Sequence, residues 1–543
     1  TVTGVQTCAL PISPEAKEKF PEAHFAKVFP FYGIKHYEEV DPAKHKWKCR
    51  VVVEGSHMCT ASGEWAAFAD LGTVPSTMSA ARIAIAVHAL NPDSVILQSD
   101  CVRAYVQADM CGEVTFLRLP KNMWPSSWHG RYVDPVVRMK KALYGHPRAG
   151  DIWAEKLRDE LQQVGFEAVD ERPGVFIKDA GTEHAVTVVT YDDDLLFIGK
   201  DTSGERGVRD VIRRVRESIN MEDPKDITKY LGVHHEIVKD EQGTSIRYDM
   251  KEYLQSAVRT FEEDTGLDLR PAPTPFVPEI NQIEFDKLMG SPGAYREKAA
   301  SYTMRLMYAA RMAVPSIMTA VSRLTREISR WTRDSDRKLV RLMSYVKGAS
   351  DVFLKGRLNY QDADSLVIHA WPDADLAGDE MTTKSTSGFF LELAGPGGRG
   401  IPVSWGSKRQ GCTATHTAEA EIVSLASCLK SEVIPTQMLI ERILGRPVPA
   451  IIFEDNAAAI VAASKGYSPS MRYLKRTQRT SIGLVYDITH PDMNNQRIKD
   501  GFENIVVSKC PTSEQKGDLF TKCLPRAGFE AALDKIRMTQ HGQ

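Results

Sequence analysis

The chain has 543 residues and a mass of 60.5 kDa, several times the usual size of one domain, so at least two domains are expected. Hydrophobic residues make up 42% and charged residues 26%, which excludes a wholly disordered or membrane-embedded chain. The net charge of −2 lacks the basic excess usual in nucleic-acid-binding proteins, although a sum over several domains hides opposing patches.

The nine cysteines are scattered along the chain. Because they form no C-x-x-C pair and no His/Cys cluster at zinc spacing, they predict neither a zinc site nor a disulfide framework. Reduced thiols in an intracellular compartment are the simplest interpretation. No apolar run reaches the roughly 18 residues that a membrane helix needs, so no membrane partner is predicted.

The first residues, TVTGVQTCALPIS, differ from the rest of the chain. They have no basic segment like that of a signal peptide, and they resemble a translated sequencing-adapter fragment. We therefore expect residues 1–13 to be an artefact or disordered, and we leave them out of the predicted fold.

Strand-like and helix-like segments alternate from Lys46 to Ile198. Apolar runs such as VTFLRL and EHAVTVVTY predict strands, and the periodicity of MSAARIAIAVHAL and AGDIWAEKLRDELQQVGF predicts helices. This part of the chain is therefore predicted to be a mixed α/β block.

The segment AVTVVTYDDDLLFIG predicts a buried hairpin with Asp192, Asp193 and Asp194 at its tip. Adjacent carboxylates repel one another unless a cation neutralises them, although an acidic surface turn is an equally simple interpretation. Asp100 follows another apolar run upstream. If both strand ends meet, the carboxylates form a hard-oxygen site for Mg²⁺ and substrate phosphates, as in polymerases.

A close family resemblance is carried by several motifs in order: KWKCRVVVEG, LQSDCVRAYVQADM, MKKALYGHPRAGDIWAEKL, TYDDDLLFIG, KYLGV and YLQSAVRTF followed by PTP. They resemble the reverse transcriptase of copia-type LTR retrotransposon polyproteins. The resemblance places Asp193 and Asp194 on the metal-binding pair of the Tyr-x-Asp-Asp box, with Asp192 in the variable position. It places Asp100 on the third catalytic aspartate.

The same resemblance implies nucleotide-binding roles for three further residues. Tyr105 takes the place of the aromatic gate against the 2′-OH, with core packing as a comparable alternative. Lys48 and Arg50 lie on the finger strand near the incoming triphosphate, whereas isolated residues of this kind are more often solvated charges. Two departures stand out, because Glu54 replaces the usual Lys and GHPRAG replaces GLKQAP, where Arg148 offers a compensating charge.

Helix-like periodicity follows from Lys251 to Gly348, interrupted by the Pro-rich RPAPTPFVPE. Residues 296–350 carry twelve Lys or Arg against four Asp or Glu. A solvated basic helix is the simpler interpretation, but between two nucleic-acid enzymes this connector is placed to follow a duplex backbone.

The chain becomes α/β again from Leu366, with three strands, a long helix, a strand, a short helix and a last strand. Asp373 and Asp375 share one face if their strand stays regular. Glu419 and Glu421 point about 200° apart on the helix, so at most one can face a shared site, and periodicity does not choose between them. Asp455 ends a strand, and Asp518 lies at a predicted helix start.

The motifs PDADLAGD, KSTSGFFLEL, VSWGSKRQ, TAEAEIVSLA, EDNAAAI and GDLFTK resemble the RNase H domain of the same polyproteins. The resemblance implies a two-metal set of Asp373, Glu421, Asp455 and Asp518, with Asp375 as a neighbour. A Lys-His pair common in the family is replaced by MRYLKRTQRTS. The basic run there, with Lys465 before it, predicts phosphate contacts from Arg472, Lys475, Arg476 and Arg479.

The resemblance as a whole implies an α/β and α+β multidomain fold, with a fingers-palm-thumb polymerase (ferredoxin-like palm) followed by an RNase H-like domain. The expected bounds are 27–250 for fingers and palm, 251–360 for thumb and connection, and 366–530 for the RNase H-like domain. The implied activities are RNA-directed DNA polymerase and ribonuclease H.

The resemblance also implies cofactors, partners and location. The cofactor is Mg²⁺ or Mn²⁺, and the partners are an RNA template, a DNA primer, dNTPs and an RNA–DNA hybrid. The implied location is a cytoplasmic virus-like particle with later nuclear entry. The competing hypothesis is an inactive, decayed or domesticated copy that only binds nucleic acid.

Overall fold

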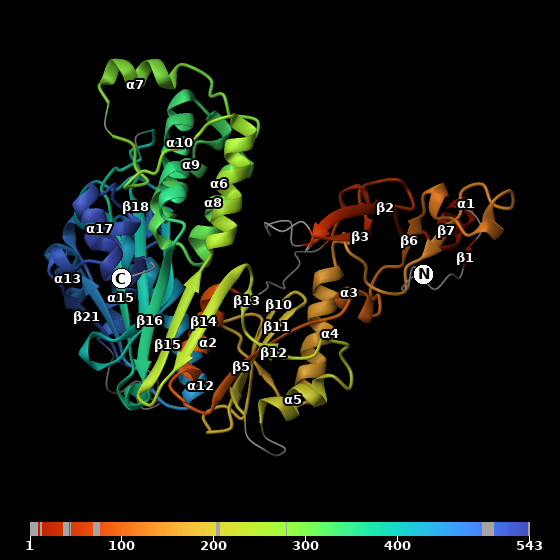
Figure 1. The fold of residues 1–543 in the computed structure, drawn as a ribbon, viewed down its shortest axis with the longest axis horizontal. Coiled ribbons are helices and arrows are strands. Elements are labelled where there is room, and N and C mark those ends of the chain that lie inside the picture. Colours follow the sequence, from red (N-terminus) through yellow and green to blue (C-terminus); the bar gives the residue numbers. More distant parts are fainter. Residues whose placement is uncertain are drawn as a thin grey trace.

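The computed structural model describes residues 9–540 apart from 11–12, 36–42, 44, 69–75, 202–206, 279, 380 and 491–503. Three sheets carry the described chain, and helices cover faces of the second and third sheets (Figure 1). The mixed α/β character predicted from the sequence is confirmed. None of the described helices is long and apolar enough to cross a membrane.

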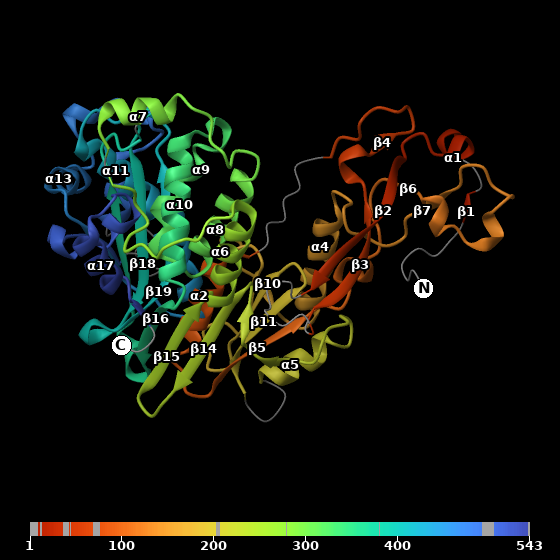
Figure 2. The ribbon, with the colours of Figure 1, turned by 45° about the horizontal axis from the view of Figure 1, so that its top comes forward.

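The first sheet has the strand order β1-β7-β6-β2-β3, and β4 pairs with β2. It projects to one side of the molecule, away from the C-terminal strands (Figures 1 and 2). The exclusion of residues 1–13 from the fold was wrong for Ala9–Leu10, because their backbone pairs with β7, and helix α1 already begins at Ser13. The bounds are β1 Ala9–Leu10, β2 His24–Lys35, β3 Lys46–Val53, β4 Cys59–Thr60, β6 Thr115–Arg118, β7 Val136–Arg138 and α1 Ser13–Lys19.

The second sheet has the order β12-β5-β11-β10-β9-β8. Side chains alternate across these strands, so that Leu195 and Phe197 pack under α4 and α5 while Leu196 and Ile198 pack under α2. The sheet is therefore buried on both faces. The bounds are β5 Ser94–Asp100, β8 Glu167–Ala168, β9 Val175–Lys178, β10 Val186–Tyr191, β11 Asp194–Lys200, β12 Lys225–Asp226, α2 Met78–His88, α3 Ala104–Gln107, α4 Ala149–Gln163 and α5 Val208–Val215.

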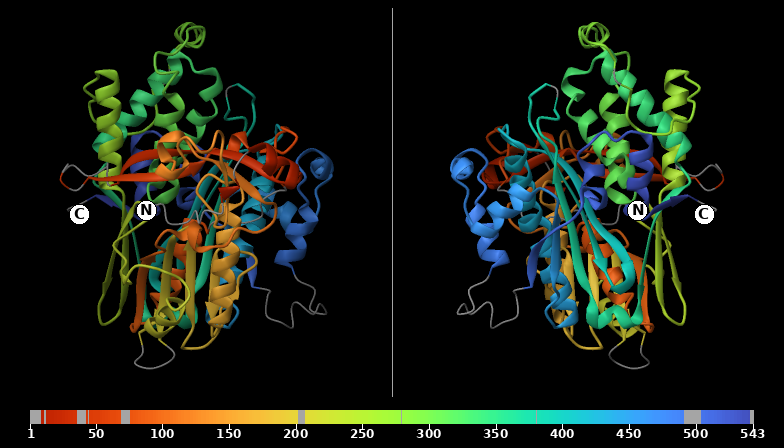
Figure 3. Two further views of the ribbon diagram at one scale, coloured as in Figure 1. Left: turned by 90° about the vertical axis from the view of Figure 1, so that its right-hand side faces the viewer. Right: turned by 90° about the vertical axis from the view of Figure 1, so that its left-hand side faces the viewer.

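The predicted helical region folds as a group of helices beside the third sheet (Figure 3). Thr332 begins the last of them in a reciprocal capping box with Ser335. The bounds are α6 Lys251–Thr265, α7 Gln282–Met289, α8 Ala299–Met312, α9 Met318–Thr325 and α10 Arg333–Gly348.

The third sheet has ten strands, in the order β13-β14-β15-β16-β19-β18-β17-β20-β21, with β22 paired to β16. Strands β17, β20 and β21 are parallel, and the other pairs are antiparallel. The bounds are β13 Lys229–Tyr230, β14 Val233–Lys239, β15 Gly243–Asp249, β16 Val352–Asn359, β17 Val367–Ala374, β18 Thr386–Ala394, β19 Gly400–Arg409, β20 Ala450–Glu454, β21 Ile505–Lys509, β22 Met538–Gln540, α11 Thr417–Cys428, α12 Ile434–Leu444, α13 Ala457–Lys465, α14 Leu474–Thr477, α15 Ile482–Thr489 and α17 Arg526–Lys535.

Two features join the parts of the chain. Strand β15, which precedes the helices, pairs with β16, which follows them, from Gly243 opposite Asn359 to Tyr248 opposite Leu354. Arg82 of α2 is buried, and its guanidinium donates hydrogen bonds to the carbonyls of Val403 (2.9 Å) and Met312 (2.6 Å). A continuous sheet and a buried cation therefore connect both α/β blocks.

Candidate functional sites

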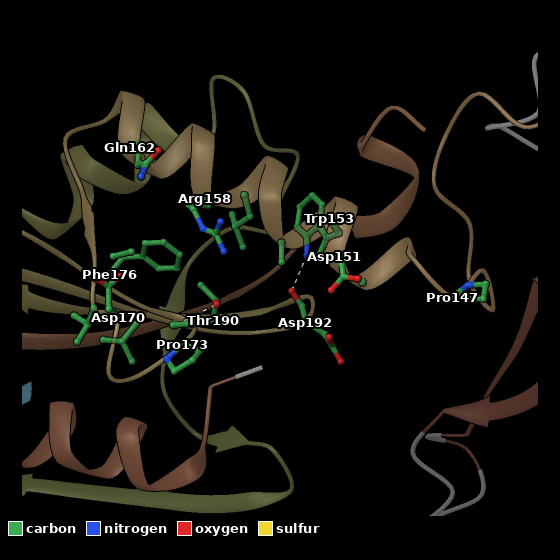
Figure 4. A pocket seen from close by; sticks show the side chains of 17 residues that line it. Pro147, Asp151, Trp153, Arg158, Gln162, Asp170, Pro173, Phe176, Thr190 and Asp192 are labelled. Carbon is green, nitrogen blue, oxygen red and sulfur yellow. Dashed lines mark hydrogen bonds between the residues drawn. The ribbon is translucent and has the colours of Figure 1, made fainter. Parts of the chain in front are cut away.

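The first acidic site lies at the turn between β10 and β11. Tyr191 pairs with Asp194, so Asp192 and Asp193 form a two-residue turn, as the sequence predicted. Asp192 has φ of 51°, a left-handed conformation that Asp tolerates better than most residues. The buried indole of Trp153 donates a hydrogen bond to the Asp192 carbonyl at 2.8 Å (Figure 4). A cavity of about 570 Å³ lies beside this turn and is lined by residues of α4 and of the second sheet. Figure 4 shows the side chains that line it.

Asp100 lies directly beside this turn, because the register of β5 and β11 pairs it with Asp194. Burial, a hydrogen bond with Asp100 and the charges of Asp100 and Asp193 raise the pKa of Asp194 to about 7. The hydrogen bond with Asp100 shows that the two carboxyl groups lie close together. Carboxylate oxygens held in this way suit a hard divalent cation.

An aromatic pair separates this turn from strand β3. The Arg50 guanidinium lies 5.0 Å from the ring centre of Tyr144, and the rings of Tyr144 and Tyr105 are 4.6 Å apart. Burial and then the charge of Asp192 raise the pKa of Tyr105 to about 12. The structure therefore brings Arg50 and Tyr105 to the acidic turn and adds Tyr144, which the sequence analysis missed although it lies in the KALYG motif.

The remaining residues that were singled out in this part of the sequence are exposed or paired. Lys48 is exposed on β3. Glu54, the charge-reversing departure, lies 3.1 Å from His57 Nδ1. Arg148 lies 3.6 Å from Glu113, so part of its charge is already balanced.

The second acidic site lies at the end of the third sheet. Asp373 of β17, Glu421 of α11 and Asp455 after β20 bring one carboxylate oxygen each to within 4.8 Å of one another. Helix α11 is fixed there because Ser424 donates a hydrogen bond to the Asp373 carbonyl at 2.8 Å. Asn456 caps helix α13 and thereby fixes the chain just after Asp455.

Burial and mutual repulsion raise the pKa of acidic groups in this site. Burial and the charges of Asp373 and Glu454 raise the pKa of Glu421 to about 10. Burial also raises the pKa of the neighbouring Glu454 to about 8. Glu421 Oε2 is buried and has no hydrogen-bond partner among the described residues. An all-oxygen donor set with an unpartnered buried oxygen fits a divalent cation.

The structure distinguishes Glu419 from Glu421, which the periodicity of the helix alone did not. Glu419 is turned away and accepts hydrogen bonds from Thr415 Oγ1 (2.7 Å) and Tyr473 OH (2.7 Å). Asp375 lies beyond the end of β17, where Arg323 contacts it at 3.1 Å. Glu421 therefore joins Asp373, and Asp375 does not.

Asp518 is close to this site but is not part of the three-residue group. It lies in the 3-10 helix Gly517–Phe520 and forms a short ion pair with Lys522. Lys522 Nζ is also 3.3 Å from Asp373 Oδ1. Lys522 was not predicted, and its only signal in the sequence is the i,i+4 spacing from Asp518.

The predicted basic surfaces differ in how far their charge is neutralised. In the connector, many cations pair with acidic groups: Arg323 with Asp375, Arg326 with Asp379, Lys338 with Glu327 and Lys347 with Glu262. The second run remains exposed, and Tyr473 in its middle is bonded to Glu419 on the helix that carries Glu421. Its exposed members are Lys465, Arg472, Lys475, Arg476 and Arg479.

Comparison with known proteins adds independent findings. Residues 30–275 match the family model described as reverse transcriptase (RNA-dependent DNA polymerase). The chain is 24% identical over 510 residues to the retrovirus-related Pol polyprotein from transposon RE1 of Arabidopsis thaliana, covering 92% of this chain and 31% of that protein. It is 27% identical over 502 residues to the RE2 polyprotein of the same plant (91% and 31%), and 22% identical over 504 residues to that of transposon TNT 1-94 of Nicotiana tabacum (91% and 34%). The chain thus spans about a third of the length of these relatives.

Proposed function

We propose that this chain copies RNA into DNA and degrades the copied RNA. The premise is that the chain carries a reverse transcriptase domain and is related to copia-type retrotransposon polyproteins. The resemblance that the motifs indicated is confirmed at the level of the family. The observation that carries the proposal is the assembly of two separate carboxylate groups, one beside each predicted acid motif.

The proposed architecture follows the sheets. The first sheet corresponds to the fingers, the second to the palm and helices α6–α10 to the thumb and connection. The order β19-β18-β17-β20-β21, with three antiparallel strands followed by two parallel additions, supports an RNase H-like domain. The proposed bounds are 27–250, 251–360 and 366–530, with β1 and the start of β2 before the first bound and β13–β15 paired into the third sheet.

At the first site, Asp100, Asp193 and Asp194 would hold Mg²⁺ or Mn²⁺, which supplies charge for phosphoryl transfer when bound. The primer 3′ oxygen attacks the α-phosphorus of a dNTP and loses its proton to solvent, while the bond to the pyrophosphate oxygen breaks. Arg50 neutralises triphosphate charge, with Lys48 on the same strand. Tyr105, whose ring contacts that of Tyr144, is proposed to exclude a ribose 2′-OH.

At the second site, Asp373, Glu421 and Asp455 would hold a divalent cation, which makes water a better nucleophile when bound. Water adds to a phosphorus of the RNA strand, the bond from phosphorus to the ribose oxygen breaks, and that oxygen takes a proton. The exposed run Arg472, Lys475, Arg476 and Arg479 is proposed to bind phosphates of the hybrid.

The test is Mg²⁺-dependent dNTP incorporation on an RNA template, measured beside cleavage of a labelled RNA–DNA hybrid. We expect Asp193→Asn to abolish incorporation and retain cleavage, and Asp455→Asn to do the reverse. If the unmodified protein incorporates no dNTP with Mg²⁺ or Mn²⁺, the polymerase proposal is wrong, and an inactive nucleic-acid-binding derivative becomes the better account.

A further inference from the structure

The second acidic site contains a cation of its own. Lys522 Nζ contacts carboxylate oxygens of both Asp373 and Asp518, and Thr521 donates its hydroxyl hydrogen bond to the other oxygen of Asp373. The Lys522 side chain is 38% exposed, so its ammonium pairs with these two carboxylates at the edge of the site.

The backbone around Lys522 is fixed to the sheet. The Lys522 amide donates to the Asp518 carbonyl at 2.9 Å, and Arg323 donates to the Thr521 carbonyl at 2.9 Å. The Phe520 ring is fully buried and stacks on Phe390 of β18. Because the chain is anchored on both sides of residue 522, its side chain has a short and defined path to Asp373.

The ion pair with Lys522 keeps Asp518 apart from the group of three carboxylates. Asp373, Glu421 and Asp455 converge within 4.8 Å, whereas Asp518 is paired with Lys522. Three carboxylates with one oxygen each, completed by water and a substrate phosphate, suffice for one Mg²⁺. A second divalent ion between Asp373 and Asp518 would have to displace the ammonium.

We propose that Lys522 is the second cation of the hydrolytic centre, so that this centre binds one divalent ion and uses the lysine ammonium in place of another. The inference rests on the hydrolytic function proposed above. The ammonium has three hydrogens to donate and two carboxylate partners among the described residues, so one hydrogen can be donated to an oxygen of the scissile phosphate. The ammonium thereby stabilises the negative charge that builds up there as the phosphorus–oxygen bond breaks.

The experiment counts Mn²⁺ ions at this site by equilibrium binding and by electron paramagnetic resonance. The full chain carries Asp193→Asn and Asp194→Asn, which empty the first site, and a non-cleavable RNA–DNA hybrid is bound. We expect one Mn²⁺ per chain, and one again with Lys522→Arg. Lys522→Met should bind two, with a spectrum broadened by coupling between neighbouring ions.

The controls separate the possible failures. Lys535→Met, on α17, should leave the count at one, and a thermal melt of every variant verifies folding. Two Mn²⁺ ions in the protein that retains Lys522, or a single ion in Lys522→Met, would overturn the inference and leave the hydrolytic function intact. If Asp455→Asn does not lower the count, no ion is bound at this site, and the inference and the proposed hydrolytic function both fail.

Discussion

The two carboxylate sites differ in how the protein balances their negative charge. At the first site, burial and the neighbouring acidic groups raise the pKa of Asp194 to about 7. At the second site, burial raises the pKa of Asp373 to about 6, but Lys522 opposes this rise. The first site thus has no lysine or arginine among the causes of its raised pKa, whereas the second has a built-in cation in Lys522.

The largest effect is expected for the two glutamates of α11. Glu421 belongs to the group of three carboxylates, and Glu419 is turned away from it. We expect Glu421→Gln to lower hybrid cleavage by a factor of about 10³ or more, because it removes a metal-binding charge. Glu419→Gln, the matched control, should lower it only a few-fold, because Thr415 and Tyr473 can still bond the amide. Equal losses in a cleavage assay would contradict the assignment of Glu421.

The first site can be perturbed without touching a carboxylate. Trp153→Phe removes the hydrogen bond to the Asp192 carbonyl and leaves that oxygen unpaired, at a cost of about 1–2 kcal/mol. We expect kcat for dNTP incorporation to fall by about tenfold, with KM and hybrid cleavage little changed. Asp192→Gly, which accepts the φ of 51°, should retain incorporation. A loss of both activities in Trp153→Phe would indicate general destabilisation instead.

Without metal, the free energy of unfolding should fall with rising pH, over a different pH range for each of the two sites. Folding raises the pKa of Glu421 from 4.5 to about 10 and that of Asp194 from 3.8 to about 7, so the folded state binds more protons. Stability is therefore lost as pH rises, by up to about 1.4 kcal/mol per unit for the buried Glu421. In thermal melts with a chelator, the stability of Glu421→Gln should fall less steeply with rising pH than that of the unmodified protein, up to pH 10. For Asp194→Asn the difference should end at pH 7. Parallel curves for both variants would refute this.

The smallest effect is expected at the exposed basic run. Arg476→Ala should weaken hybrid binding a few-fold and lower the slope of log affinity against log salt by about 1. Incorporation on a short primer should be unaffected. Arg213→Ala is the control, because Arg213 already pairs with Asp210 and Glu217 on α5. An unchanged salt slope in Arg476→Ala would remove this run from the hybrid-binding surface.

Local patterns predicted the first site better than the second. The alternation of apolar residues defined the hairpin, and the hairpin alone brings Asp193 and Asp194 to its tip. Pairing with Asp100 needed only one more strand end. A site built on adjacent strands of one sheet is therefore largely readable from sequence.

The second site depends on contacts that no local pattern encodes. Glu419 and Glu421 both flank the apolar stripe of α11, and the hydrogen bonds that hold Glu419 away from the site come from Thr415 nearby and from Tyr473, more than fifty positions away. Lys522 reaches Asp373 because Phe520 packs on β18. The pairing of β15 with β16 was likewise unpredicted, because residues 250–351, which are mostly helical, separate the strands.

That strand pairing has a consequence for proteolysis. A protease that nicks the chain anywhere among α6–α10 breaks the covalent path between the two halves but not the six residue pairs between β15 and β16. Arg82 of α2 continues to bond Val403 across the same boundary. Nicked protein would therefore migrate as two fragments in denaturing gels and as one particle in native separation.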